Sequence, residues 1–339
     1  MRHLLLLLLV SALPADKVVV AASGDLKEPF GVDFDKSGAM FIVEMGGNRV
    51  RKMEKDGTLA VYAGTGEKGD AGDGGPAAKA QLNGPHHLGV GPDGDLYITD
   101  TWNNRVRKID AKTGVISTVA GTGQKGFSGD GGPAAKAQFG GIYCLAFDAK
   151  GEHLYLADLD NRRIRAVALK TGIVTTVAGN GQKGAPQDGA EAKAAPLVDP
   201  RAVTVDSKGN VYILERSGNA LRVVDPAGKI RTVAGNGKAG LSGDGGAALQ
   251  AQMNGPKHLC VDAEDNVIIA DTESHAIRKY SPKDGKIARV AGAGKKGSAG
   301  VGGAPDQVEL SRPHGVSVHS SGVLYISDSD NNRVLRLEK

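Results

Sequence analysis

The sequence predicts an all-β fold, a six-bladed β-propeller whose blades are four-stranded antiparallel sheets. One motif recurs six times, and each copy carries an acidic residue at the end of an apolar run: Glu44, Asp100, Asp158, Glu215, Asp271 and Asp328. Successive markers are 56, 58, 57, 56 and 57 residues apart, and a fixed period of this length is the signature of a repeat architecture. Helical periodicity is nearly absent, while short runs of Val, Ile, Leu and Tyr alternate with turn residues.

The second copy shows how one repeat supplies four strands. Its apolar runs cover residues 87–90, 96–99, 105–109 and 115–120. Tight turn signals separate them, Pro-Asp-Gly at 92–94 and Lys-Thr-Gly at 112–114, which favours hairpin connections. A sheet of this size cannot bury its own faces, whereas six sheets packed around an axis cover one another.

The two ends of the chain complete one blade. The sixth copy ends at 332–337, which corresponds to its third strand, and residues 17–22 (Lys-Val-Val-Val-Ala-Ala) have the pattern of the missing fourth strand. We expect this N-terminal strand to close the ring, which removes two exposed sheet edges.

Composition favours a single propeller domain over residues 16–339, and we expect it to be a monomer. The 339 residues are 40% hydrophobic but only 4% aromatic, so the core is expected to consist of aliphatic side chains. The net charge is +4, and the basic residues are spread over all copies. Without a basic face interleaved with aromatic residues, nucleic acid is not an expected partner.

Residues 1–15 have the pattern of a secretory signal peptide. Met-Arg-His is followed by an apolar run at 4–10 and small residues at 11–15, and the run is too short to span a bilayer. We therefore expect a periplasmic or extracellular protein. Cys144 and Cys260 fall in copies three and five, which are not neighbours in the ring, so we expect both thiols to stay free.

The repeat unit resembles the NHL repeat. All six copies carry versions of Gly-Pro-x-x-apolar followed by Asp-Gly-x-Leu-Tyr-Ile-x-Asp-Thr-x-Asn-Asn-Arg-Val-Arg-Lys. The linkers, Val-Ala-Gly-Thr-Gly followed by Gly-Asp-Gly-Gly-Pro-Ala, are similar to those of exported bacterial NHL-repeat proteins. This resemblance implies a propeller that binds partners on one face; it does not imply an enzyme.

Residues that recur in every copy are interpreted as structural. The six acidic markers are expected to accept hydrogen bonds from backbone and from Arg49, Arg105, Arg163 or Arg333, although a ring of carboxylates binding a cation is the alternative. In the inserts, Asp73 and Asp130 precede short Pro-Ala-Ala-Lys-Ala-Gln segments, and Asp244 precedes a variant of this segment. Asp188 lies in a degenerate copy, and Val301 stands in the same place of the fifth insert. We expect these aspartates to cap short helices, with a calcium or phosphate loop as the alternative.

Residues that differ between copies are better candidates for function. Two variable positions open each inner strand: Phe30-Gly31, His86-His87, Ile142-Tyr143, Arg201-Ala202, Lys257-His258 and His314-Gly315. Six inner strands surround one axis, so these side chains should converge on the face that carries the long Gly-rich inserts. Convergent polar groups of this kind predict a ligand-binding site made by His86, His87, Tyr143, Arg201, Lys257, His258 and His314.

Histidines around a channel also suggest a divalent metal, zinc or calcium. The arrangement resembles that of the peptidyl-hydroxyglycine amidating lyase, a propeller with zinc histidines on alternate blades. At the matching positions of blades two, four and six, this chain has His86, Arg201 and His314, so Arg201 replaces the third histidine. A guanidinium cannot ligate a metal, so His87 or His258 would have to complete a different set. Simple hydrogen bonding of these histidines is the alternative. A resemblance to the regucalcin and gluconolactonase propellers is weaker, because only Glu28 before Pro29 matches their metal motifs.

Trp102, the only tryptophan, is predicted in a loop on the same face, where it would either contact a ligand or pack under an insert. Together these residues predict an exported propeller that binds a small molecule, a carbohydrate or a protein, and Arg201 and Lys257 favour an anion. The alternative is a metal-dependent lyase or hydrolase acting at the central channel, with His86 and His314 on the metal and Arg201 orienting an anionic substrate.

Overall fold

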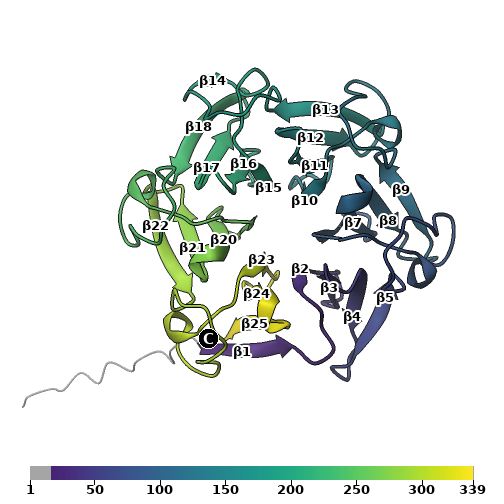
Figure 1. The fold of residues 1–339 in the computed structure, drawn as a ribbon, viewed down its shortest axis with the longest axis horizontal. Coiled ribbons are helices and arrows are strands. Elements are labelled where there is room, and N and C mark those ends of the chain that lie inside the picture. Colours follow the sequence, from purple (N-terminus) through teal and green to yellow (C-terminus); the bar gives the residue numbers. More distant parts are fainter. Residues whose placement is uncertain (1–16, 339) are drawn as a thin grey trace, which may run out of the picture.

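Each repeat folds into one antiparallel sheet (Figure 1). In the first five blades the four main strands run in chain order from the central axis to the rim, and in the sixth the N-terminal strand of the chain is outermost. The computed structural model describes residues 17–338, so the predicted signal peptide lies outside the described residues. Six such sheets surround the axis, and the predicted six-bladed propeller of four-stranded antiparallel blades is confirmed.

The first three blades follow the hairpin pattern of the sequence. They contain β2 (Pro29–Phe34), β3 (Met40–Glu44), β4 (Arg49–Met53) and β5 (Leu59–Ala63); β6 (Leu88–Val90), β7 (Leu96–Asp100), β8 (Arg105–Ile109) and β9 (Ile116–Ala120); and β10 (Ile142–Phe147), β11 (His153–Asp158), β12 (Arg163–Ala168) and β13 (Ile173–Ala178).

The last three blades include two additions from elsewhere in the chain. They contain β15 (Pro200–Val205), β16 (Val211–Glu215), β17 (Ala220–Val224), β18 (Lys229–Ala234) and the short outer β14 (Ala190–Glu191); β19 (His258–Val261), β20 (Val267–Asp271), β21 (Ala276–Ser281) and β22 (Lys286–Ala291); and β23 (Pro313–Val318), β24 (Leu324–Asp328), β25 (Arg333–Glu338) and β1 (Lys17–Ala22).

Short 3-10 helices are confined to the connections. Four lie in the inserts, η1 (Ala77–Lys79), η3 (Ala134–Lys136), η4 (Ala248–Gln250) and η6 (Pro305–Gln307). Three lie between second and third strands, η2 (Thr101–Asn103), η5 (Thr272–Ser274) and η7 (Ser329–Asn331). In three copies an asparagine of the second-to-third connection donates to the preceding insert, as Asn103 Nδ2 does to Gly69 O at 2.8 Å. Both kinds of loop therefore lie on one face, which we call the insert face.

The ring is closed by the N-terminal strand, as predicted. β1 pairs antiparallel with β25, with Val18 opposite Leu337 and Val20 opposite Leu335 (Figure 1). Val18 is fully buried and also exchanges backbone hydrogen bonds with the last insert, at Gly302 and Gly303. The core lies between the faces of adjacent blades, as where Phe41 and Val43 pack with Leu88 and Ile98.

The six recurring acids are held by donors of the protein. All are fully buried, and each accepts a backbone N–H from the end of the preceding connection. Asp100, for example, accepts from Asn83 N at 2.8 Å, Asn103 Nδ2 at 2.9 Å and Arg105 Nε at 3.1 Å. In blade three the guanidinium nearest Asp158 is that of Arg165 at 3.5 Å, and Arg163 donates to backbone carbonyls instead. This arrangement favours the structural interpretation.

The helix-cap prediction for the insert aspartates is wrong. The residue that precedes η1 is Pro76, and no side chain caps that helix. The Asp73 carboxylate instead binds Arg107 of the next blade at 2.6 Å and Thr118 Oγ1 at 2.6 Å. Asp130–Arg165 and Asp244–Arg278 repeat this ion pair at 2.7 Å each. In three inserts the acid therefore attaches the insert to the blade that follows, a contact that local sequence does not reveal.

Candidate functional site: the insert-face end of the axial channel

Three rings of side chains line the axis. The upper tier, at the insert face, is Phe30, His86, Tyr143, Arg201, Lys257 and His314. The middle tier, one residue further along each strand, is Gly31, His87, Cys144, Ala202, His258 and Gly315. The lower tier, two residues deeper, is Asp33, Gly89, Ala146, Thr204, Cys260 and Ser317, and it lines a cavity of about 220 Å³. Register irregularities at the strand starts, as between Pro29 and Gly31, bring two successive residues to the axis.

One prediction about these positions needs correction. Ile142 pairs with Asp158 as Pro29 pairs with Glu44, so the variable pair of blade three is Tyr143-Cys144 and not Ile142-Tyr143. Gly140 N–H binds Asp158 as Asn83 N–H binds Asp100, so Gly141 corresponds to Gly84, and Ile142 occupies the place that proline takes at the start of the other inner strands.

The upper-tier side chains are in mutual contact. The Phe30 ring stacks on His314 with centroids 4.0 Å apart and meets the edge of His86 at 5.2 Å. His86 in turn contacts Tyr143 at 4.6 Å, and the Arg201 guanidinium lies over the Tyr143 ring at 4.4 Å. The structure thus brings together the predicted residues of blades two, three, four and six.

Lys257, His87 and His258 join the same channel. Lys257 Nζ lies 3.4 Å from His314 Nε2 and forms an ion pair with Glu273 at 2.7 Å. His87 and His258 meet across the middle tier, with ring centroids 4.3 Å apart. Gly31 makes room for this approach, because a Cβ there would lie 3.0 Å from His87 Cδ2. Phe30, Cys144 and Glu273 belong to the site but were not among the predicted site residues.

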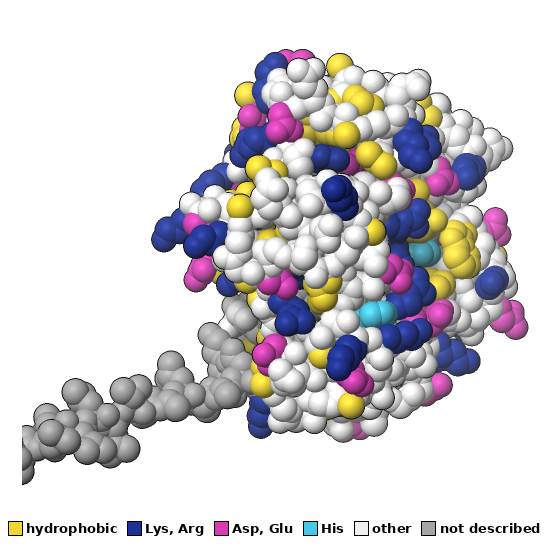
Figure 2. All heavy atoms as spheres, turned by 60° about the vertical axis from the view of Figure 1, so that its left-hand side comes forward, with side chains coloured by type: hydrophobic (Ala, Val, Ile, Leu, Met, Phe, Trp, Pro, Cys, Tyr) yellow, Lys and Arg dark blue, Asp and Glu magenta, His cyan; other side chains and the backbone are white. Residues whose placement is uncertain are grey.

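Trp102 stands at the rim of the upper tier. It is 45% exposed, its ring meets the edge of His86 at 5.9 Å, and Lys68 Nζ lies over it at 5.5 Å. It also packs on Gly84, where φ is +55° and an added Cβ would be 2.4 Å from the ring. Trp102 therefore packs on the end of the insert and keeps part of its ring exposed, and its contact with a ligand stays a prediction. In the space-filling view, histidine side chains are visible beside lysine and arginine side chains (Figure 2).

The histidines of the two tiers hold their protons on different nitrogens. His86 Nδ1 lies 2.7 Å from Gly84 O and His314 Nδ1 lies 2.8 Å from Arg312 O, so both Nδ1 atoms must carry the proton. In the middle tier, His87 Nδ1 accepts from Leu145 N–H at 3.4 Å and His258 Nδ1 accepts from Val316 N–H at 3.3 Å. Their neutral rings therefore carry the proton on Nε2.

Burial keeps all four imidazoles neutral. It lowers the pKa of His86, His258 and His314 well below the ordinary value and that of His87 to about 4, and nearby cations add to the effect. Burial raises the pKa of Cys144 to about 11, so its thiol is also neutral.

Each of the two tiers places side chains that could ligate a metal around the axis. His87, Cys144 and His258 offer ligand atoms within 4.8 Å of one another. However, His87 and His258 hold protons on the nitrogens that do not bond to backbone, and the Arg201 cation lies near both rings. At the upper tier the His86 and His314 Nε2 lone pairs are suited to a metal, but both rings pack on Phe30 and Lys257 Nζ lies beside His314 Nε2. Neither arrangement favours a cation.

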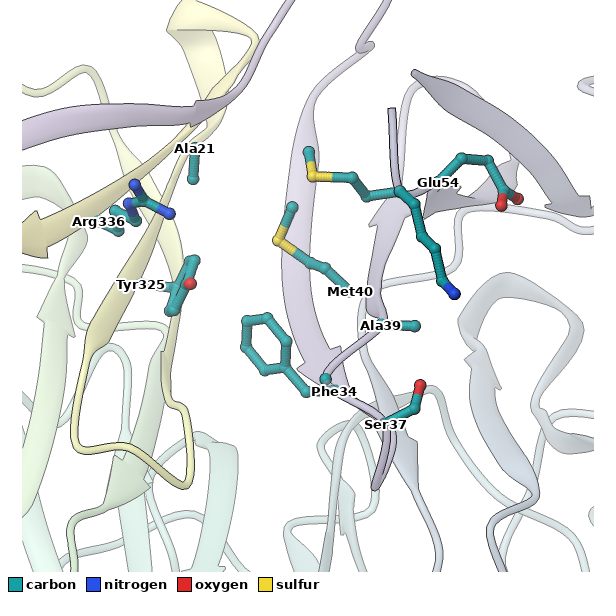
Figure 3. A pocket seen from close by; sticks show the side chains of 11 residues that line it. Ala21, Phe34, Ser37, Ala39, Met40, Glu54, Tyr325 and Arg336 are labelled. Carbon is teal, nitrogen blue, oxygen red and sulfur yellow. The ribbon is translucent and has the colours of Figure 1, made fainter. Parts of the chain in front are cut away.

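A separate cleft of about 320 Å³ lies where blades one and six meet, away from the predicted site residues. Phe34, Met40, Tyr325 and Arg336 project into it (Figure 3). Its lining includes the β2–β3 turn, so it opens opposite the insert face.

Sequence comparison identifies the repeat. A family model of the NHL repeat matches residues 82–109 and 310–337, which belong to blades two and six. The chain is thus a six-bladed β-propeller in which two blades match the NHL repeat. None of the helices in residues 17–338 has the length and hydrophobicity needed to cross a membrane.

Curated relatives are larger proteins. NHL repeat-containing protein 2 of Gallus gallus is 23% identical over 342 residues, which is 91% of this chain and 46% of the relative. SUPPRESSOR OF QUENCHING 1 of Arabidopsis thaliana is 26% identical over 250 residues, 70% of this chain and 23% of the relative. The chain thus spans less than half the length of these relatives.

Solved structures share the fold at low identity. An auxiliary nutrient binding protein of Bacteroides thetaiotaomicron superimposes with a TM-score of 0.68 at 14% identity, covering 95% of this chain and 76% of that one. Virginiamycin B lyase of Staphylococcus aureus gives 0.60 at 13%, covering 96% and 99%. A gluconolactonase of Xanthomonas campestris gives 0.61 at 11%, covering 95% and 89%.

Proposed function

We propose that this NHL-type propeller binds a small ligand, or the tip of a protein partner, at the upper tier of its insert face. One observation carries the proposal. Six positions that are equivalent by the repeat hold Phe30, His86, Tyr143, Arg201, Lys257 and His314, and these different side chains meet around one axis.

The contrast with the acidic markers explains why this observation points to a ligand. The six markers hold only Asp or Glu, because every blade needs the same backbone acceptor. Blade geometry gives no reason for one repeat position to hold aromatic residues in some blades and cationic residues in others, whereas ligand recognition uses a few placed polar groups in an apolar, aromatic setting. The nutrient-binding proteins that share the fold are consistent with a binding role, but the lyase and the gluconolactonase share it too, so the fold alone does not decide.

The single tryptophan gives a direct test. Trp102 stands at the site, so monosaccharides, amino acids and small carboxylates can be screened by its fluorescence and by thermal shift. A compound that binds should change both signals, and Tyr143→Ala should lower its affinity about tenfold. The matched control is Phe127→Ala, which should leave affinity unchanged. Phe127 lies in an insert, is about as exposed as Trp102 and packs on Arg163. Equal losses in both variants would refute the site.

The alternative is a metal-dependent lyase or hydrolase. The Nδ1–H bonds of His86 and His314 to backbone carbonyls resemble the orientation of metal-ligating histidines. Elemental analysis of the purified protein decides between the two. Stoichiometric zinc or calcium that is lost in a His86→Ala and His314→Ala double variant would favour the enzyme.

Export is part of the proposal and rests on the sequence of residues 1–15 alone. N-terminal sequencing of protein recovered from outside the cytoplasm should begin at or close to residue 16. A protein that keeps Met1 and stays in the cytoplasm would contradict it.

A further inference from the structure

We propose that the group recognised at this site is an oxyanion, a carboxylate, phosphate or sulfate whose oxygens accept hydrogen bonds from the Arg201 guanidinium and from His258 Nε2–H. This inference rests on the ligand site proposed above and names the chemistry of what it binds.

Arg201 is unlike the other buried arginines of the ring. It is 5% exposed, its Nε has no hydrogen-bond partner, and its one hydrogen bond goes from Nη1 to Tyr143 O at 3.5 Å. No carboxylate lies within 4.0 Å of it in the part of the chain that the structure describes. By contrast, Arg107, Arg165 and Arg278 each have an aspartate at 2.6–2.7 Å. A buried guanidinium without a counter-charge is costly unless an anion compensates it.

The histidines below supply further donors. His258 is 6% exposed, and its Nε2 is buried without a partner. Because its Nδ1 accepts from Val316 N–H, Nε2 carries the proton and can only donate. His87 faces it with the same tautomer, set by Leu145 N–H. Arg201 and His258 open β15 and β19, the inner strands of two adjacent blades that pack against each other, so the guanidinium of the upper tier and the imidazole of the middle tier share one stretch of the channel.

The charges around the site favour an anion over a cation. Arg201, Lys257 and Arg312 come from three adjacent blades, and the one carboxylate among them, Glu273, is already bound by Lys257 at 2.7 Å and Arg312 at 3.0 Å. Asp199 is held by Arg216 at 2.8 Å. Burial keeps Cys144 as a neutral thiol, so it adds no negative charge. In the lower tier, the buried Asp33 carboxyl accepts hydrogen bonds from Phe34 N–H and Val90 N–H, and burial raises its pKa to about 6. The upper and middle tiers therefore offer a cation and N–H donors but no free carboxylate.

The test is a titration of the full chain with acetate, inorganic phosphate and sulfate at constant ionic strength, followed by Trp102 fluorescence and calorimetry. At least one anion should bind, and Arg201→Gln should weaken it about 30-fold or more, the loss typical of a buried charge partner. His258→Ala should weaken it about tenfold. Arg216→Gln is the matched control: it removes an arginine of the same blade that already has a carboxylate, and affinity should change less than about twofold.

A second readout separates recognition from folding. Without anion, Arg201→Gln should melt at or above the wild-type temperature, because it removes a buried uncompensated charge. A lower melting temperature together with an unchanged anion response would overturn the proposal. So would stoichiometric binding of Zn²⁺ with a thiolate absorption band that Cys144→Ser abolishes. If a neutral sugar binds at Trp102 and Arg201→Gln has no effect, the ligand site stands and the oxyanion inference fails. If neither anions nor neutral compounds change the Trp102 signal, the proposed function itself fails.

Discussion

The ion pair between Asp73 and Arg107 allows a quantitative test of how the inserts are attached, because the chain contains its own control. In three inserts an aspartate binds a buried arginine of the next blade. At the equivalent positions of the last insert and blade six, Val301 and Leu335 replace the acid and the base together. The double variant Asp73→Val with Arg107→Leu copies that natural pair.

The expected magnitudes follow from burial. Asp73→Val leaves the fully buried Arg107 without its carboxylate, which should cost about 3 kcal/mol. Arg107→Leu should cost about 2 kcal/mol, because Gln81 O loses its donor at 2.8 Å while the Asp73 carboxylate, 38% exposed, can rehydrate. The double variant removes both charges of the pair and should cost about 1–2 kcal/mol. The coupling energy between Asp73 and Arg107 is therefore expected to be about 3 kcal/mol.

The assay is equilibrium unfolding in urea followed by circular dichroism for the wild type, both single variants and the double variant. The same cycle at Asp130 and Arg165 of the next blade should give a similar coupling. If the double variant loses as much as the two single variants combined, the pair does not act as a unit and the reasoning is refuted.

Three further predictions concern the ring and the site. Deletion of residues 17–22 should cost a few kcal/mol, because β25 loses its partner and the buried Val18 is removed; a variant that melts at the wild-type temperature as a monomer would contradict ring closure. Between pH 4 and 6.5 the unfolded chain protonates His87 while the native state, with a pKa of about 4, does not, so stability falls as the pH is lowered. Between pH 7 and pH 4 the free energy of unfolding of the wild type, measured in urea, should therefore fall by up to about 3 kcal/mol more than that of His87→Gln. If the two proteins show the same dependence of stability on pH, this prediction is wrong. Gly84→Ala should displace Trp102 and shift its fluorescence, whereas Gly94→Ala, at φ +88° with open space around it, should not.

The fold could be predicted from the sequence because the period and the turn residues are local signals repeated six times. The pairing of residues 17–22 with the last blade also followed, since four strands were needed and three were present. Convergence of the upper tier could be predicted for the same reason: every inner strand begins at the same distance from the axis.

The chemistry of the site depended on contacts that no local pattern encodes. Arg107, the partner of Asp73, lies 34 residues further along the chain. The local sequence around Asp73 therefore favours a helix cap, which the structure does not contain. In blade three Ile142, and not Gly141, occupies the place of the strand-opening proline, so Cys144 rather than Tyr143 lies in the middle tier. Lys257 was expected to act with Arg201 on an anion, but Glu273 binds it. That Arg201 has no such partner, and that His258 donates rather than accepts, follows only from the three-dimensional arrangement.

The most direct test of the central claim is to locate a bound anion. Crystals soaked in selenate can be measured at the selenium absorption edge, where anomalous scattering marks the ion independently of the protein. The account predicts an anomalous peak on the axis within hydrogen-bond distance of Arg201 and His258 Nε2, and its loss in Arg201→Gln crystals. Anomalous peaks confined to exposed lysines on the outer rim would contradict the proposed site.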